Sequence, residues 1–207
     1  MEITSINQLI QYFQLNFPEY AKEMQSCTHH YDEQNLNVYH LEGDIWAHTN
    51  MVLMQIRDMN LSVDRFKVAA ISALLHDIGK PAAAEYKHET KRKRFIGHEG
   101  LSTVIAIEVL EKMVADGIVS NGEAITILKV VNLHSALFDV VKEGADHSKL
   151  ISKFRYQKEL FKYVQIQSEA DSNGRYYDEE VVNTPGHHKE MPQEVFNEIY
   201  DCIAPER

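Results

Sequence analysis

The 207-residue sequence contains little cysteine, no long apolar run and no sustained alternation of apolar and polar residues. Its two cysteines, Cys27 and Cys202, belong to no CxxC pair, which argues against a disulfide framework and a thiolate metal site. We expect both to be buried or incidental thiols. No apolar run approaches the roughly 18 residues of a membrane span, and the amino terminus lacks a basic region followed by an apolar one. These absences predict a cytoplasmic protein.

The sequence also lacks the positive charge of a protein that coats nucleic acid. The formal net charge is -10, whereas nonspecific nucleic-acid affinity comes from neutralising phosphates. The charge is uneven, because the segment "KHETKRKR" at 87–94 holds five basic residues and one acidic residue. This segment is ordinarily a solvated surface, and the functional alternative is a lip that draws an anionic nucleotide or RNA end toward a site.

The remaining composition is that of a soluble globular protein, with 44% hydrophobic and 25% charged residues. The length suits one domain, and we find no internal repeat, low-complexity tract or long linker that would divide residues 1–207. We therefore expect a single domain. Its motif-bearing core spans about 38–175, and the N-terminal helix and the acidic C-terminal segment after Gly174 pack on it.

Apolar residues recur at helical spacing through most of the chain, which predicts an all-α bundle. Thr4 or Ser5 can cap the first helix and Asp44 the second, while Gly79 and Pro81 follow the third. The segment from Pro81 to Phe95 is polar and without clear period, which predicts a loop. We expect helices at about 6–13, 45–56, 62–75, 98–115, 121–133, 148–171 and 192–203.

The most informative stretch is "SALLHDIGKPAA" at 72–83, where an apolar helix ends in a His–Asp pair, His76 and Asp77. Such a pair arises easily by chance and can simply cap a helix end, so its surroundings must decide. Other polar groups lie on a helix or near helix ends where they can converge above a common core, namely His48, His98, His134 and Asp171.

Imidazoles and carboxylates together suit a borderline or hard divalent ion such as Mn, Fe, Co, Ni, Zn or Mg. Burying Asp77 and Asp171 without a cation would be costly. If His48 joins them with His76, the four side chains supply a ligand set that leaves room for water and a phosphate oxygen. A cation in that position can lower the pKa of water and polarise phosphorus.

At this point the sequence resembles the HD-domain phosphohydrolases, whose pattern is a His, a His–Asp pair, further His residues and a distal Asp. In more detail it is similar to the HD domain attached to bacterial CCA-adding tRNA nucleotidyltransferases. The resemblance runs from about Val38 to Arg175 and rests on five ordered motifs: "YHLEGDIWAHTNMVL", "ALLHDIGKP", "RFIGHEG", "VVNLH" and "EADSNGR". The chain shows no Gly-Ser motif followed by paired aspartates, so we do not expect it to carry out CCA addition.

The resemblance implies roles for particular residues. It implies that His48, His76, Asp77 and Asp171 bind the metal, and that His98 and His134 either bind a second ion, with Asp77 bridging, or hold the substrate phosphate. We predict that Lys80 contacts phosphate or neutralises charge, the alternative being a solvated turn residue. As catalytic residues, His98, His134 or Lys80 would steady the phosphate or protonate the leaving oxygen. We predict that Arg175 contacts phosphate, the alternative being a salt bridge that fixes the Asp171 turn.

Other residues carry a structural interpretation. The paired histidines His29–His30 and His187–His188 have no matching partners, and we expect them at the surface. Trp46 is expected to pack in the core near His48.

The predicted function is that of a metal-dependent phosphohydrolase acting on a nucleotide or RNA-end phosphoester. The resemblance favours 2',3'-cyclic and 2'-phosphates. Two alternatives stay open: a nucleoside 5'-monophosphate phosphatase, and a metal-stabilised module that binds RNA or a partner protein.

Overall fold

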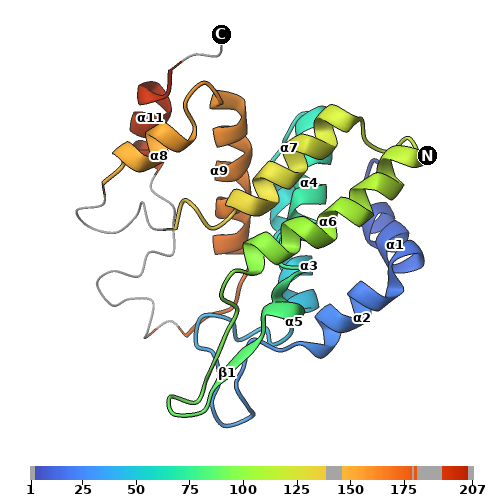
Figure 1. Cartoon of the computed structure of the whole chain (residues 1–207), viewed down its shortest axis with the longest axis vertical. Helices are drawn as coiled ribbons and strands as arrows, with labels where there is room; N and C mark the ends of the chain where they lie inside the picture. Colours follow the sequence, from blue (N-terminus) through green and yellow to red (C-terminus); the bar gives the residue numbers. More distant parts are fainter. Residues whose placement is uncertain (1–2, 139–145, 179, 181–192, 205–207) are drawn as a thin grey trace.

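The chain folds into a helical bundle, as the sequence predicts, and a computed structural model describes residues 3–138, 146–178, 180 and 193–204 (Figure 1). Besides its helices, the chain forms a two-stranded antiparallel sheet of β1 (Glu85–Lys87) and β2 (Arg92–Arg94). The helices in these parts of the chain are α1 (Ile6–Asn16), α2 (Pro18–Ser26), α3 (Ile45–Asp58), α4 (Val63–Leu75), α5 (Lys80–Ala83), α6 (His98–Ala115), α7 (Asn121–Leu133), α8 (Ser148–Lys153), α9 (Lys158–Asn173) and α11 (Gln193–Cys202).

Polar side chains fix where several helices begin. The Ser5 hydroxyl accepts a hydrogen bond from the Gln8 amide at the start of α1, and the Asp44 carboxylate accepts one from the Ala47 amide at the start of α3. Ser120 forms a capping box with Glu123 at the start of α7. Each cap satisfies backbone amides that the helix itself leaves unpaired, so these starting points are encoded locally.

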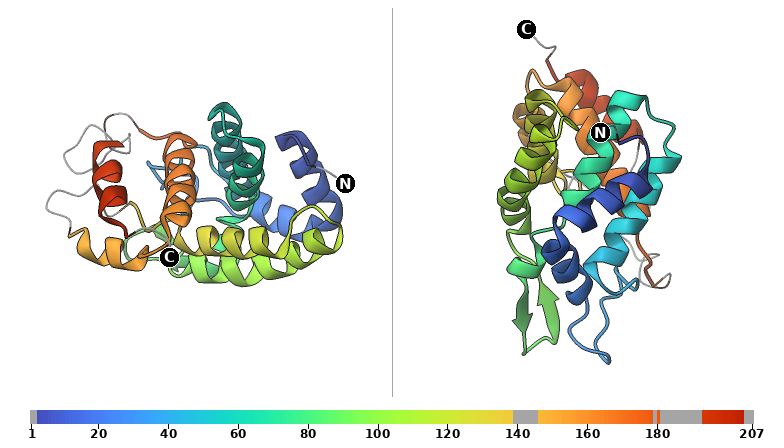
Figure 2. Two further views of the ribbon diagram at one scale, coloured as in Figure 1. Left: turned by 90° about the horizontal axis from the view of Figure 1, so that it is seen from above. Right: turned by 90° about the vertical axis from the view of Figure 1, so that its right-hand side faces the viewer.

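Helix α4 is the central element. Every residue from Val68 to Leu75 is buried, so the helix is covered on all sides rather than on one face. It packs against α3, α7 and α9. Helices α6 and α7 lie side by side along one side of the molecule, and α1, α4, α9 and α11 stand in a row across them (Figure 2). This arrangement holds the end of α4 inside the bundle.

Two apolar clusters stabilise the bundle. The larger one surrounds α4, and the smaller one joins α8, α9 and α11 through Phe154, Phe161 and Phe196. Trp46 packs against the larger cluster and stacks on Phe13 with ring centroids 5.9 Å apart, which confirms its predicted place in the core.

The described cysteines are not paired with each other. Cys27 is buried and Cys202 is exposed, and both are free thiols.

Most predicted helices are confirmed, but two details of the prediction are wrong. Helix α2 was not predicted, although Pro18 at its first position is a helix-start signal. The predicted helix at 148–171 is divided into α8 and α9, because the connection between them contains Tyr156 with a left-handed φ of 63°.

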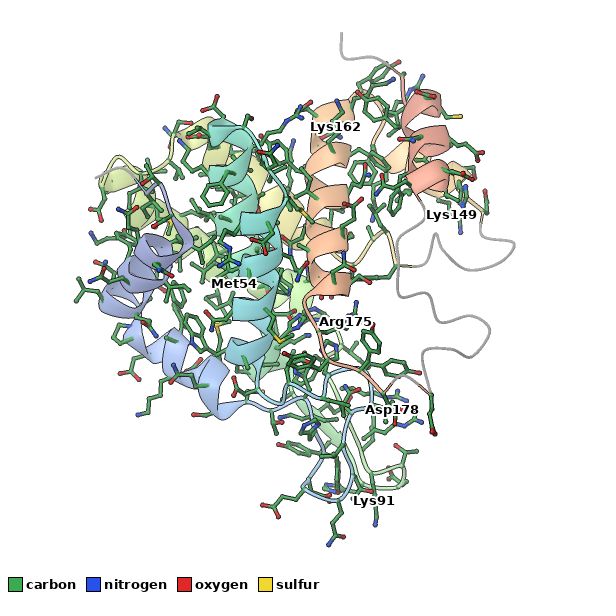
Figure 3. The ribbon with its side chains drawn as sticks, turned by 180° about the vertical axis from the view of Figure 1, so that it is seen from behind. Met54, Lys91, Lys149, Lys162, Arg175 and Asp178 are labelled. Atoms are coloured by element: carbon green, nitrogen blue, oxygen red, sulfur yellow. The ribbon has the colours of Figure 1, made fainter. Side chains whose placement is uncertain are left out.

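The predicted loop from Pro81 to Phe95 is also wrong. Pro81 lies in the first turn of α5, and the basic segment forms the hairpin of β1 and β2. Lys93 holds the hairpin against the body, because its Nζ donates to the Thr28 carbonyl at 2.7 Å. Figure 3 shows Lys91 at the far end of this hairpin, away from the helices. Contacts with residues distant in the sequence therefore fix the structure of a segment whose own apolar pattern is irregular.

None of the helices in the described parts of the chain combines the length and apolar character needed to cross a membrane.

Candidate metal centre

The polar groups predicted to converge do lie together. His48 is the fourth residue of α3, His76 and Asp77 follow α4, His98 begins α6, His134 follows α7, and Asp171 lies near the end of α9. The start of α6 and the end of α7 meet near the lower end of α9 in Figure 1. Five helices thus deliver these side chains to one region.

One group consists of His48, His76 and Asp171, which are all buried and whose ligand atoms lie within 4.8 Å of one another. His48 Nε2 lies 3.1 Å from Asp171 Oδ1. Three side chains from three helices therefore offer nitrogen and oxygen atoms at a spacing that one metal ion could span.

Asp77 lies between this group and a second group that contains His98 and His134. Asp77 Oδ2 is 3.2 Å from His76 Nε2, whereas Asp77 Oδ1 is 3.3 Å from His98 Nε2. The Nε2 atoms of His98 and His134 lie 3.2 Å apart. Each oxygen of Asp77 thus faces one group, which is the arrangement of a carboxylate able to bridge two ions.

Three of the imidazoles have their orientation set by the backbone. The Nδ1 atoms of His76, His98 and His134 lie 2.7, 2.8 and 2.7 Å from the carbonyl oxygens of the residues three positions earlier. Because a carbonyl can only accept, each Nδ1 carries the proton. Each Nε2 then keeps its lone pair directed at the cluster, as a metal ligand requires.

Lys80 points into the site rather than toward solvent. It is buried, its Nζ lies 2.7 Å from Asp77 Oδ2, and the same Nζ lies 3.2 Å from His29 Nε2. The solvated-turn alternative for Lys80 is therefore wrong. The turn that carries Lys80 passes close to α6. This contact requires Gly79, since a Cβ at that position would lie 2.3 Å from the Ser102 backbone nitrogen.

The expected surface position of His29 is wrong as well. Its side chain is buried, because Lys80 and the parallel ring of His40 cover it. His30 is partly buried, and its Nδ1 accepts a hydrogen bond from the Asn37 amide. His187 and His188 lie outside the described residues.

Arg175 lies just beyond the end of α9 (Figure 3). Its Nε donates to the backbone carbonyl of Asp171 at 3.3 Å, and its guanidinium carbon lies 5.4 Å from the centre of the Phe138 ring. Arg175 therefore fixes the Asp171 turn through a hydrogen bond to the main chain.

The charges of the cluster are strongly coupled. Burial opposes ionisation of Asp77 and Asp171, yet the neighbouring cationic groups outweigh burial and hold the pKa of both carboxyls well below the usual range. Burial likewise opposes the charged form of His48, but the carboxylates of Asp171 and Glu42 raise the pKa of His48 to about 9. By contrast, burial lowers the pKa of His134 to about 4. Without a metal, Lys80 therefore pairs with the ionised Asp77 and the charged imidazole of His48 pairs with the ionised Asp171.

These residues fit a divalent cation. Among the described residues, several buried atoms of the cluster have no hydrogen-bond partner of suitable geometry, namely both ring nitrogens of His48, Nε2 of His76 and both oxygens of Asp77. Buried polar atoms almost always have hydrogen-bond partners, so a set of nitrogen and oxygen atoms left without them calls for a ligand. The nitrogen and carboxylate composition is that of a site for a borderline or hard divalent metal.

The comparison with protein families agrees with this geometry. The family model of the HD domain matches residues 45–173, which is more than half of the chain. The chain belongs to the HD-domain family. Members of the HD-domain family are generally metal-dependent hydrolases that bind divalent ions. Among curated proteins, none matches this chain closely.

Three further side chains near the HD-domain cluster were not predicted to take part in the site. His29, His40 and Glu42 lie together, with ligand atoms within 4.8 Å of one another. His40 and Glu42 belong to the motif "YHLEGDIWAHTNMVL", but no regular spacing relates them to His48. The turn before α3 brings His40 and Glu42 next to His48, and this turn is recognised only in the folded structure.

Proposed function

We propose that this protein is a metal-dependent phosphohydrolase that acts on nucleotide or RNA-end phosphoesters, preferably 2',3'-cyclic phosphodiesters and 2'-phosphates. The observation that carries the proposal is the buried cluster in which two aspartates and four imidazoles from five helices meet. Family membership supports the hydrolytic class of reaction.

The proposed ligands are His48, His76, Asp77 and Asp171, and the Asp77, His98 and His134 group is the proposed place for a second ion. A divalent ion bound there supplies positive charge beside the phosphate and makes water acidic enough to ionise near neutral pH. The protein's own contribution is to hold these side chains close together before any ion is bound. The three backbone-oriented imidazoles already present Nε2 to the cluster.

When the second position holds no ion, Nε2 of His98 is available to carry a proton, and we assign proton donation to His98 in that state. Hydrolysis joins a water oxygen to phosphorus and breaks one P–O bond of the ester, and the departing ribose oxygen needs a proton. Burial lowers the pKa of His98, but Asp77 beside it outweighs burial and raises it, which favours the protonated ring. His98 is also more exposed than His134, with 14% of its side chain accessible against 2%. It therefore stands nearer to an entering substrate.

The two basic residues have different proposed roles. Lys80 neutralises Asp77, since its ammonium is already paired with that carboxylate and is largely buried. Arg175 is partly exposed at the end of α9 and remains the candidate for a phosphate contact.

The substrate class rests on two supports. One is the resemblance of the five motifs to the HD domain of CCA-adding enzymes. The other is the hairpin, whose Arg92 and Arg94 are exposed and lie on an otherwise acidic protein. Such a local cationic surface favours the approach of an anionic nucleotide or RNA end.

The test is direct hydrolysis. Purified protein with Mn²⁺, Co²⁺, Ni²⁺ or Mg²⁺ should open 2',3'-cyclic AMP, and Asp77→Ala should reduce turnover at least about 1,000-fold, because it removes the carboxylate shared by both groups. Asp58→Ala removes an exposed carboxylate and serves as the matched control. Equal turnover by wild type and Asp77→Ala would reject the mechanism.

A panel of 2', 3' and 5' monophosphates tests the substrate. Preference for the 2' ester supports the proposal, whereas preference for the 5' ester would replace it with a nucleoside 5'-monophosphate phosphatase. Tight RNA binding without turnover under all four metals would instead identify a binding module.

A further inference from the structure

His48 differs from the other imidazoles of the site in the way its ring is held. His76, His98 and His134 lie at helix ends and place Nδ1 against a backbone carbonyl three residues earlier. His48 lies inside α3, where carbonyls accept hydrogen bonds from the helix itself. A side chain must therefore hold its Nδ1 if the ring is to have a fixed orientation.

Glu42 is in the position to do this. Its Oε1 lies 3.0 Å from His48 Nδ1, and only 2% of the Glu42 side chain is exposed. At this distance the pair does not have hydrogen-bond geometry in this structure, so the His48 ring must turn toward Glu42 to complete the bond. On the opposite side of the ring, His48 Nε2 faces Asp171 and Asp77.

We propose that Glu42 is a positioning residue that accepts the Nδ1 proton of His48 and so keeps His48 Nε2 available as a metal ligand. The inference rests on the metal site of the proposed function. A carboxylate behind a ligating imidazole fixes its tautomer and orientation and raises its basicity as a ligand.

Glu42 is itself held by the segment that follows Asp171. Its Oε2 accepts a hydrogen bond from the Tyr176 amide at 3.0 Å, and the Leu41 amide donates to the Tyr176 carbonyl at 2.8 Å. The turn that carries Glu42 is thus joined to the chain just beyond α9. Glu42 therefore couples the orientation of His48 to the position of Asp171, although these ligands lie on different helices.

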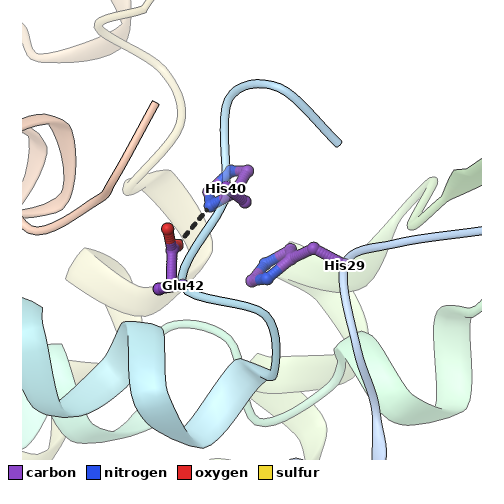
Figure 4. A group of neighbouring side chains, drawn as sticks. All are labelled: His29, His40 and Glu42. Atoms are coloured by element: carbon purple, nitrogen blue, oxygen red, sulfur yellow. Dashed lines mark hydrogen bonds and ion pairs between the residues drawn. The ribbon is translucent and has the colours of Figure 1, made fainter. Parts of the chain in front are cut away.

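The group of His29, His40 and Glu42 is better suited to positioning His48 than to binding a metal ion of its own. Figure 4 shows His40 and Glu42 on the segment before α3, with His29 facing them. The rings of His29 and His40 are stacked, with centroids 4.0 Å apart and planes at 8°. An imidazole binds a metal in the plane of its ring, and two stacked parallel planes share no such point. Glu42 Oε1 is also occupied by His40 Nδ1 at 2.8 Å.

The experiment measures Zn²⁺ affinity by calorimetry for wild type, Glu42→Ala and Glu42→Gln. Zn²⁺ alone is the probe, and no substrate is present. We expect the dissociation constant to rise about 10- to 100-fold in Glu42→Ala. Glu42→Gln should recover part of this loss, because its amide oxygen can still accept from His48. Glu33→Ala removes an exposed glutamate of the same loop and should leave the affinity unchanged.

The second readout is the proton on His48 Nδ1 in the Zn²⁺-loaded wild type, observed by ¹H–¹⁵N NMR. A downfield, slowly exchanging Nδ1 proton that is lost in Glu42→Ala supports the inference. The wild-type spectrum keeps the inference open to refutation even if the alanine variant does not fold, since a Nδ1 without a proton would overturn it.

Two failures can be told apart. If wild type binds Zn²⁺ and both Glu42 variants bind it equally well, the inference is wrong and the proposed function stands. If wild type binds no divalent ion at the cluster, both are wrong.

Discussion

At the scale of single residues, the site is a balance of buried charges. Asp77 is surrounded by His76, His98 and Lys80, and it is buried to 1% exposure. An isolated carboxylate at that depth would be strongly destabilising, and its neighbours offset the cost. Lys80 is the permanent cation of this set when no metal is bound, so its contribution can be measured in the presence of a chelator.

We predict that Lys80→Met lowers the free energy of unfolding by about 3 kcal/mol in EDTA, because it leaves the buried Asp77 carboxylate without its ion-pair partner. Urea unfolding followed by circular dichroism measures this. Lys87→Met is the matched control: Lys87 also pairs with a carboxylate, but its side chain is 37% exposed, so the change should stay below about 1 kcal/mol. Similar losses in the two variants would contradict the buried pairing of Lys80.

At the scale of secondary-structure elements, helix ends decide where the ligands lie. The turn after α4 must pass close to the start of α6 for Asp77 and His98 to meet. Gly79 makes this possible, since an added Cβ would lie 2.3 Å from the Ser102 nitrogen and 2.8 Å from the His98 carbonyl. Backbone atoms at these positions cannot move aside as a side chain can.

Gly79→Ala should therefore destabilise the protein by about 2 kcal/mol or more, since the turn and α6 must separate to admit the methyl group. Gly100→Ala is the control within α6, because no atom lies within 4 Å of its added Cβ and alanine favours a helix. Thermal melts of both variants provide the measurement. A Gly79→Ala protein as stable as wild type would show that the two elements are not in this contact.

The cap at the start of α7 should make the stability of the protein depend on pH. Glu123 completes the capping box with Ser120 and lies 2.6 Å from Lys67 Nζ. Burial raises the pKa of Glu123, but Lys67 and the Ser120 groups outweigh burial and hold that pKa below its ordinary value. Because the folded-state pKa is depressed, the stabilisation is present above the unfolded-state value and is lost as pH falls through the folded-state value.

Glu123→Gln should accordingly lower the melting temperature at pH 7 and flatten its decline between roughly pH 5 and pH 3. Melting curves at half-unit pH steps would show this. Glu111→Gln removes a charge from an exposed position in α6 and should keep the wild-type acid dependence. A Glu123→Gln profile parallel to that of wild type would rule out the ionised cap.

At the scale of the whole molecule, the site joins helices from distant parts of the sequence. The proposed ligands come from α3, from the turn after α4 and from α9, which pack on one another around the larger apolar cluster. An ion held by all three would bind the folded chain and not the unfolded one. Its binding free energy would then add to the stability of the fold.

A divalent ion at 100 times its dissociation constant should add about 2.7 kcal/mol and raise the melting temperature by about 5 to 11 °C for a chain of this size. Asp171→Asn should lose most of the increase. Asp58→Asn, which changes an exposed carboxylate, should keep it. Differential scanning fluorimetry with Mn²⁺ or Ni²⁺ compares the three proteins. An equal increase in all three would place the ion elsewhere.

The sequence by itself determined the helical class, most helix ranges and the HD pattern. These follow from local properties, such as apolar spacing, the capping residues Ser5 and Asp44, and motifs whose residue types suit a metal. The hairpin, the burial of His29 and the role inferred for Glu42 were decided only by the tertiary structure. Each depends on partners far along the chain, Lys93 with Thr28, His29 with Lys80 and Glu42 with Tyr176. No local periodicity encodes such contacts, because packing brings these residues together only once the helices have assembled.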